Sequence, residues 1–205
     1  MENSVKLIGT YGGDLEHAAS AWCSTDSELT PEKLNRLGKF LKDLAVQGHH
    51  APYEKSMLHF HVVCDTASHI HLLKHRIGVS LSGESARYKE LKDDKYYIPD
   101  DWPEWAKSLA VNQHIQAYSI YHQVLELLVK EGMDRHRAKE SARFILPYAN
   151  QLNLNVSFNF RSFMHFQKLR NDEHAQKEIR EIAQKMLDLV KNTHKFDLSL
   201  EAFGY

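Results

Sequence analysis

The chain has 205 residues, of which 42% are hydrophobic and 26% charged, a composition typical of a folded globular protein and not of a disordered one. Its formal net charge of −1 excludes a globally basic nucleic-acid-binding protein. No apolar run approaches the roughly 18 to 20 residues of a membrane span, and the N-terminus lacks the layout of a signal peptide. With two cysteines, Cys23 and Cys64, we expect reduced thiols, a cytoplasmic location and one domain over residues 1–205.

The N-terminal half predicts a helix, a strand and a second, shorter helix. The first helix is expected from Thr30, which suits an N-cap and precedes a proline, to Gly48, which suits a helix end. Apolar and polar residues alternate over 58–63, as in a strand with one buried face. A short helix is expected at about 67–76. The stretch 77–88, rich in glycine and serine, predicts an irregular loop.

The C-terminal half predicts three further helices. The first covers about 103–130, with one apolar face formed by Val111, Ile115, Tyr118, Tyr121, Leu125 and Leu128. The second covers about 135–145 and stops before Pro147. The third covers about 172–192, with an apolar stripe formed by Ala175, Ile179, Ile182, Met186 and Leu189. Helix therefore dominates, and we expect an α+β fold with a few strands near the N-terminal third.

Three groups of polar residues are candidates for chemistry. In the first, Lys74-His75-Arg76 is separated by the Gly/Ser loop from Ser85-Ala86-Arg87-Tyr88. Lysine supplies a point charge, arginine a planar fork and the loop backbone further donors, so this group suits an anion. A solvated turn with scattered charges is the alternative. In the second, Glu140 and Arg143 share a helix face with neighbouring cations, which also fits a surface ion pair.

The third group holds amide, guanidinium and imidazole side chains within an apolar stretch: Asn159, Arg161, His165, Arg170 and His174. These groups suit a heteroaromatic ligand with several acceptor atoms, and a hydrogen-bond network between helices is the alternative. The 14 histidines also raise a metal site. His59 and His61 are expected to share one strand face, and His71 and His75 one helix face. Because no HExxH pattern or cysteine joins them, we expect no metal ion.

Five ordered segments of the chain resemble the flavin-dependent thymidylate synthases. The family pattern Arg-His-Arg, seven residues, Ser, is here Lys74-His75-Arg76 followed by eight residues and Ser85. The other segments that match its signatures are His49–Glu54, Ala142–Pro147, Asn159–Ser162 and His174–Ile179. The resemblance spans about residues 49–182. It implies an α+β fold with a small, mostly antiparallel sheet and long helices, assembled as a homotetramer with sites between subunits.

The resemblance also implies an activity: reductive methylation of dUMP to dTMP, with FAD, 5,10-methylenetetrahydrofolate as carbon donor and NADPH as reductant. Carried over by position, the implied catalytic residues are Arg170, facing the pyrimidine, and Ser85, which is not a covalent nucleophile in this family. The implied substrate-binding residues are His71, Lys74, Glu84, Ser85, Ala86, Arg87, Arg143 and Arg170. The implied flavin-side residues are His49, Ala51, Lys74, His75, Arg76, Asn159, Arg161, His165 and His174.

The chain departs from the family pattern around the expected nucleotide pocket. Lys74 replaces the first arginine of the motif, the loop is one residue longer, and Glu84 directly precedes Ser85. His71 stands where the family has glutamine. Besides dTMP synthesis, these changes leave open a different pyrimidine nucleotide, or another one-carbon product such as a hydroxymethyl group. A metal-dependent phosphohydrolase and a non-catalytic nucleotide-binding protein are the further alternatives.

Overall fold

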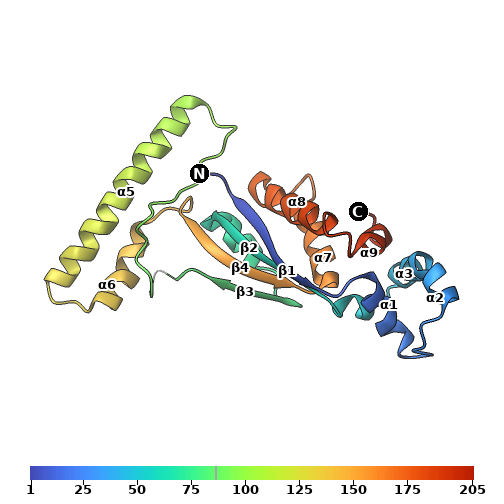
Figure 1. Cartoon of the computed structure of the whole chain (residues 1–205). Helices are drawn as coiled ribbons and strands as arrows, with labels where there is room; N and C mark the ends of the chain where they lie inside the picture. The colour runs from blue at the N-terminus through green and yellow to red at the C-terminus, as the bar shows by residue number, and fades with distance from the viewer. Residues whose placement is uncertain (86) are drawn as a thin grey trace. The chain divides into compact units, whose positions relative to one another are not determined.

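A computed structural model describes residues 1–85 and 87–205 (Figure 1). Its strands are β1 (Ser4–Tyr11), β2 (Met57–Asp65), β3 (Val79–Gly83) and β4 (Gln151–Phe158). Its helices are α1 (Asp14–Trp22), α2 (Pro31–Asn35), α3 (Leu37–Val46), α4 (Thr66–Leu73), α5 (Glu104–Lys130), α6 (Arg135–Ala142), α7 (Phe160–Arg170), α8 (Lys177–Lys191) and α9 (Asp197–Ala202), with 3₁₀ turns η1 (Ala51–Glu54) and η2 (Arg143–Ile145).

The four strands form one sheet in the order β1-β2-β4-β3. Hydrogen bonds at the strand ends show that neighbours run antiparallel. Asn3, before β1, donates its side-chain amide to Asp65 at the end of β2, at 2.8 Å. Asn159, after β4, donates its backbone N–H to the carbonyl of Gly78, before β3, at 2.9 Å. The expected α+β fold with a small antiparallel sheet and long helices is confirmed.

The chain divides into two compact units, and each strand contributes residues to both. The first unit is Met1–Ser4, Val63–Leu73 and Ser82–Leu154; the second is Val5–Val62, Lys74–Leu81 and Asn155–Tyr205. The expectation of a single domain over 1–205 stays a prediction.

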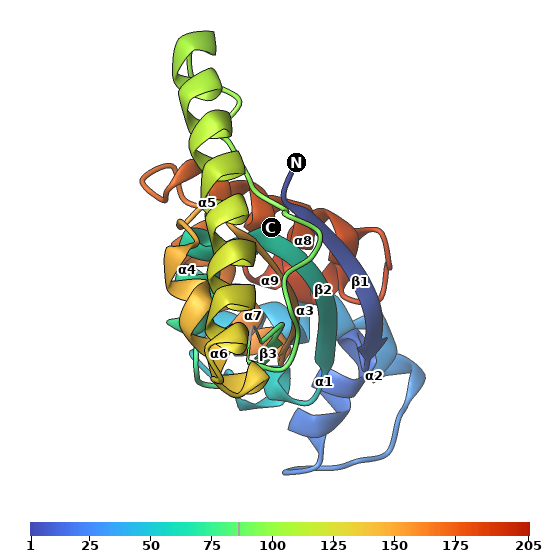
Figure 2. The ribbon, with the colours of Figure 1, turned by 90° about the vertical axis from the view of Figure 1, so that its left-hand side faces the viewer.

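The first unit is organised around α5, which packs side by side with α6 (Figures 1 and 2). Tyr118, Tyr121 and Leu125 point from α5 into a core with Leu91 and Ala142. The segment before α5 is fixed to the same face, because the hydroxyl of Tyr121 accepts a hydrogen bond from the Leu91 N–H at 3.2 Å. This packing positions the loop that follows β3.

In the second unit, α7 packs against the sheet through aromatic rings. Phe60 of β2 and Phe158 of β4 contact Phe163 of α7, with ring centroids 5.7 Å apart in both pairs. Helix α8 covers α7 and is tied to it by Gln167, which donates to the carbonyl of Ala183 at 2.9 Å. Because α7 is held on both sides, the polar residues at its two ends have fixed positions.

A second aromatic cluster holds α1, η1 and α9 together around His17. The ring of His17 lies 5.2 Å from that of Tyr53 and 5.1 Å from that of Phe160. Its two nitrogens are hydrogen-bonded to the hydroxyls of Ser199, at 2.9 Å, and Ser56, at 2.8 Å. Because both nitrogens have partners, the imidazole is accommodated in the interior without an unpaired polar atom.

Several elements agree with the sequence predictions. The strand over 58–63 is present as part of β2 with alternate residues buried, and the helix over 103–130 is α5. Thr30 caps α2 by accepting from the Lys33 N–H at 3.4 Å. The helix after Arg135 ends in the expected region, although its last turn tightens into η2. No helix in residues 1–85 or 87–205 is long and apolar enough to cross a membrane.

Other predictions were wrong. The helix expected over 30–48 breaks at Arg36 into α2 and α3, and the break lets α3 pack on α9, where Gly38 faces Leu198. The expected loop 77–88 contains β3. Strand β1 lies in the N-terminal third, where strands were expected but not located, and β4 was not anticipated. Ile115 is 57% exposed, because His114 takes the inward position and stacks on Tyr96. The helices expected over 67–76 and 172–192 are shorter, covering 66–73 and 177–191.

Candidate functional site

In the first unit, three arginines lie around one carboxylate of α6. Arg87, in the loop after β3, donates its Nε–H to Glu140 Oε1. Arg137 Nη1 is 3.6 Å from Glu140 Oε2, and the charge of Arg143 at the end of α6 also acts on this carboxyl. The hydrogen bond from Arg87 lowers the pKa of Glu140, with smaller contributions from the charges of Arg87, Arg137 and Arg143, so the carboxylate stays charged.

This arginine cluster (Arg87, Arg137 and Arg143) can bind an anion. Three positive charges face the single negative charge of Glu140, which leaves an excess of positive charge. The Arg87 and Arg137 side chains are more than half exposed, and the Arg143 side chain makes no hydrogen bond or ion pair within the described residues. The sequence placed Arg137, Glu140 and Arg143 together, but it gave no signal that Arg87, 53 residues before Glu140, joins them.

Glu84 pins the loop after β3 to β4. Its carboxylate accepts from Lys89 Nζ at 2.6 Å and from Asn153 Nδ2 at 2.6 Å. Burial alone would raise the pKa of Glu84, but these hydrogen bonds lower it below its usual range. Ser85 Oγ accepts the Arg87 N–H at 3.3 Å, which turns the chain toward the arginine cluster. The predicted site residue Ala86 lies outside the described residues, and His71 is half-buried on α4 of the same unit.

In the second unit, the end of α7 meets the Lys74-His75-Arg76 motif. Arg170, the last residue of α7, donates its Nε–H to Nε2 of His75 at 3.0 Å. The His75 ring packs edge-on against Phe166 at 5.1 Å and lies 6.1 Å from the ring of His165. Two groups that the sequence assigned to neighbouring parts of one site, Arg170 and His75, are therefore in direct contact.

The other residues near this motif are solvent-exposed. The side chains of Lys74 and Arg76, on either side of His75, make no hydrogen bond or ion pair within residues 1–85 and 87–205. The His165 ring points out from α7. His174 lies beyond α7, with its side chain 88% exposed. Because α4 ends at Leu73, His75 is not on that helix, and the expected shared helix face of His71 and His75 is wrong.

At the start of α7, Asn159 and Arg161 already have structural partners. Asn159 caps the helix by accepting from the Ser162 N–H at 2.8 Å. Gly78, with φ of +63°, passes so close that a Cβ there would collide with Asn159 and Ser162. Arg161 Nη1 donates to Glu54 Oε1 at 2.5 Å, a partner that the sequence analysis did not pair with it. The close approach of Gly78 fixes the segment after Arg76 against α7, and the Arg161–Glu54 contact fixes η1 against the same helix.

A cavity of about 690 Å³ opens beside Arg161 in the second unit. Among the predicted flavin-side residues, His49, Ala51 and Arg161 line it. Its remaining wall combines small polar residues with an aromatic pair, Trp22 and Phe40, whose rings stack 5.2 Å apart. The mixed apolar and hydrogen-bonding lining suits a large heteroaromatic ligand.

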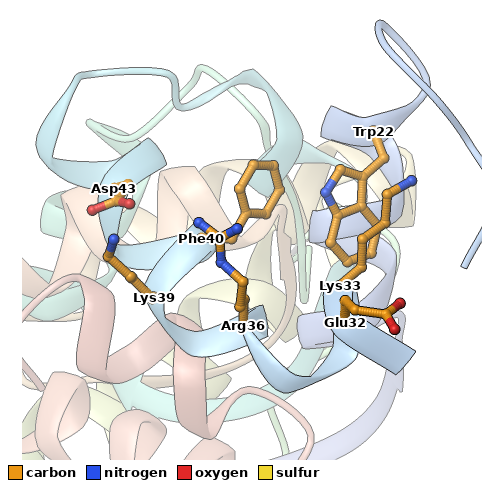
Figure 3. Close-up of a pocket in the computed structure, with 7 residues that line it drawn as sticks. All are labelled: Trp22, Glu32, Lys33, Arg36, Lys39, Phe40 and Asp43. Atoms are coloured by element: carbon orange, nitrogen blue, oxygen red, sulfur yellow. The ribbon is translucent and has the colours of Figure 1, made fainter. Parts of the chain in front are cut away.

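The same aromatic pair also lines a smaller cavity of about 210 Å³ between α1 and α3 (Figure 3). Lys33 reaches across Trp22, with its Nζ 5.4 Å from the ring centroid, and donates to the carbonyl of Asp26 at 2.6 Å. Arg36 and Lys39 share this cavity with Glu32 and Asp43, so the cations and carboxylates nearly balance. This cavity therefore has no strong preference for an anion.

The histidine pairs do not form a metal centre in the part of the chain that the structure describes. His59 and His61 lie half-buried on one face of β2, as their spacing predicted. No cluster of three or more histidine, cysteine or carboxylate side chains comes close enough to hold an ion among these residues.

Comparison with known proteins assigns the family. The sequence model described as thymidylate synthase complementing protein matches residues 6–194. A flavin-dependent thymidylate synthase from Pseudothermotoga lettingae is 30% identical over 195 residues, covering 92% of this chain and 85% of that protein. One from Thermosipho melanesiensis is 31% identical over 207 residues, covering 91% and 85%. The chain belongs to the thymidylate synthase complementing protein family, and the resemblance found in the sequence is confirmed.

Solved structures share the fold. The chain is similar to a UMP/dUMP methylase, PolB from Streptomyces cacaoi, solved with bound 5-bromo-dUMP. The TM-score is 0.81, the identity 25%, and the alignment covers 98% of this chain and 94% of that one. The same enzyme with bound 5-bromo-UMP gives a TM-score of 0.80 at 24% identity, covering 98% and 93%.

Proposed function

We propose that this protein is a flavin-dependent thymidylate synthase that converts dUMP to dTMP, with 5,10-methylenetetrahydrofolate as carbon donor and NADPH as reductant. The observation that carries the proposal is the arginine cluster, which combines an excess of positive charge with planar donors suited to a phosphate. Family membership and the nucleotide bound by the solved relative support the same substrate class.

Each part of the predicted site has a role in this reaction. Arg87 and Arg143 bind the nucleotide phosphate, with Ser85, Ala86, Glu84 and His71 near the nucleotide. Arg170 faces the pyrimidine, where its guanidinium stabilises the negative charge that develops on the ring. Lys74 replaces an arginine of the family motif, so it offers a point charge in place of a planar fork.

FAD fits the second unit. The cavity of about 690 Å³ has room for a large part of a flavin nucleotide, and His49, Ala51 and Arg161 on its wall offer both apolar surface and donors. The exposed cations Lys74 and Arg76 suit a pyrophosphate. His75, Asn159, His165 and His174 complete the proposed flavin-side set. When bound, the flavin supplies the redox chemistry, and the chain positions it and tunes its electronics.

We further propose that the protein works as a cytoplasmic homotetramer, with sites between subunits. Helix α5 supports an assembly, because it has a second apolar face opposite the one it buries. Trp105, Leu109, Ile120 and Leu127 recur on this face at spacings near whole helical turns and are each about half or more exposed. Such a stripe on a long helix is typical of a protein–protein contact.

A substrate panel tests the function. We expect the purified protein to bind FAD, seen as a flavin absorbance that bleaches with NADPH, and to form dTMP from dUMP but not thymine nucleotides from dCMP. Replacing Arg143 by alanine should weaken dUMP binding by roughly 1.5 to 3 kcal/mol, because a charged hydrogen bond is lost. The matched control is Arg180→Ala, an arginine of α8 in the second unit that is not part of the cluster. Absence of flavin, or of any folate-dependent product, would contradict the proposal.

A second candidate is a related enzyme that acts on UMP or forms another one-carbon product such as a hydroxymethyl group. The departures at Lys74 and in the longer loop favour it, as does the name of the solved relative, a UMP/dUMP methylase. Mass analysis of the products from dUMP and UMP separates the two candidates. A UMP product, or a product heavier than the methylated nucleotide by one oxygen, would select the second.

A further inference from the structure

Arg170 is held by one edge of its guanidinium only. Its Nε–H donates to His75 Nε2 at 3.0 Å, and its two Nη groups make no hydrogen bond or ion pair to the described residues. Because Nε2 accepts this bond, the proton of a neutral His75 sits on Nδ1. The arginine is half-buried, so the Nη edge is the part left to meet a ligand.

We propose that His75 is a positioning residue for Arg170: its neutral imidazole fixes the plane of the guanidinium through Nε and leaves the Nη edge to the pyrimidine. The inference rests on the proposed function, in which Arg170 faces that ring. His75 keeps its proposed flavin-side role. The inference adds that its Nε2 atom accepts the Nε–H of Arg170.

The choice of acceptor matters for the charge of the site. Arg87 and Arg161 are held by carboxylates, Glu140 and Glu54, which neutralise much of their charge. Arg170 is held by an uncharged ring, so its full positive charge remains for the negative charge that develops on the pyrimidine. If the role of Arg170 were only to complete a surface ion pair, its partner would be a carboxylate and not a neutral ring.

The imidazole is itself fixed. Its ring packs edge-on against Phe166, which is fully buried in the aromatic cluster beneath α7. Downstream, the carbonyl of Gly78 accepts the N–H of Asn159 at 2.9 Å, which ties the segment after the motif to the start of the same helix. His75 and Arg170 are therefore positioned by one element, and the geometry between them is set before any ligand binds.

Three variants test the role. In His75→Phe the ring shape is kept and the acceptor is lost, so we expect kcat for dTMP formation to fall by about 10- to 100-fold with the KM for dUMP within about twofold. His75→Gln, whose amide oxygen can accept from Arg170, should recover most of that loss. His194→Gln, an exposed histidine of the same unit, is the matched control and should behave as wild type. Flavin content is measured for each protein and used to normalise kcat.

A second readout does not depend on activity. In protein labelled with ¹⁵N-arginine, the Arg170 Nε–H signal is assigned by its loss in Arg170→Lys. We expect it to exchange slowly with water in wild type and in His75→Gln, and fast in His75→Phe. If the wild-type protein forms no product, the proposed function fails. The exchange rate of the Arg170 Nε–H then still tests whether His75 holds Arg170 in place. Equal loss of kcat in both His75 variants, or an Nε–H that exchanges as slowly in His75→Phe as in wild type, would overturn the inference.

Discussion

At the scale of single residues, His17 is a titratable group held in the protein interior. It is fully buried, and both of its nitrogens are hydrogen-bonded to serines. Ser199, one of these partners, also donates to Asp14 at 2.5 Å, so the histidine belongs to a chain of hydrogen bonds linking α1 and α9. Burial of this ring disfavours its charged form.

This gives a prediction for the pH dependence of stability. Burial lowers the pKa of His17 to about 4, from its ordinary value of 6.5. Between these two values the unfolded chain binds a proton that the folded chain does not, so the free energy of unfolding falls as the pH drops from about 6.5 to 4. The loss amounts to about 3 kcal/mol at most, by the free-energy equivalent of a pKa shift.

Urea denaturation between pH 7.5 and 4 measures this loss. His17→Gln keeps a donor and an acceptor but does not titrate, so the difference in unfolding free energy between wild type and this variant should shrink as the pH falls. His194→Gln, whose side chain is exposed, should run parallel to wild type at every pH. Parallel curves for wild type and His17→Gln would show that His17 does not carry the effect.

At the scale of secondary-structure elements, the sequence predicted those whose signals are local. Thr30 and its following proline mark the start of α2, and the alternation over 58–63 marks β2. The break at Arg36 was not predictable, because it depends on α3 packing against α9, more than 150 residues later in the chain. Strand β3 was missed because it holds five residues, rich in serine and glycine, that form a strand by pairing with β4.

The candidate site was also predicted only in part. Its residue types came from the motifs, but their partners came only from the structure: Arg87 with Glu140, Arg161 with Glu54 and Arg170 with His75. Each pair joins residues more than 50 positions apart, and nothing in local spacing reports such a contact.

Asn159 is both the N-cap of α7 and a proposed flavin-side residue, so its two roles can be separated by substitution. Asn159→Ala should lower the free energy of unfolding by about 1 kcal/mol, since the Ser162 N–H loses its acceptor. Asn159→Asp keeps an acceptor at the helix start and should retain near-wild-type stability. Thermal unfolding checks both. If the amide Nδ2 serves only the fold, Asn159→Asp binds FAD as wild type does; reduced FAD affinity in this stable variant supports the flavin-side role.

At the scale of the whole molecule, α5 connects the fold to the proposed assembly. One side of this helix is buried through Tyr118, Tyr121 and Leu125. The residues between the exposed apolar positions on the other side include Asn112, Gln116 and Gln123, which carry no charge. These central positions carry no charge, which lowers the desolvation cost of burying this part of the helix, so a second copy of the chain is a suitable partner for it.

The prediction is that a charge on this face reduces the size of the assembly. Leu109→Glu places a carboxylate at a position that is 63% exposed in the single chain, so the protomer should fold as wild type does while the contact is destabilised. Sedimentation velocity should give a smaller mass for Leu109→Glu than for wild type, with unchanged circular dichroism. Leu34→Glu, at a 47% exposed leucine of α2, is the control and should keep the wild-type mass. A monomeric wild type, or equal masses for wild type and Leu109→Glu, would contradict a contact through α5.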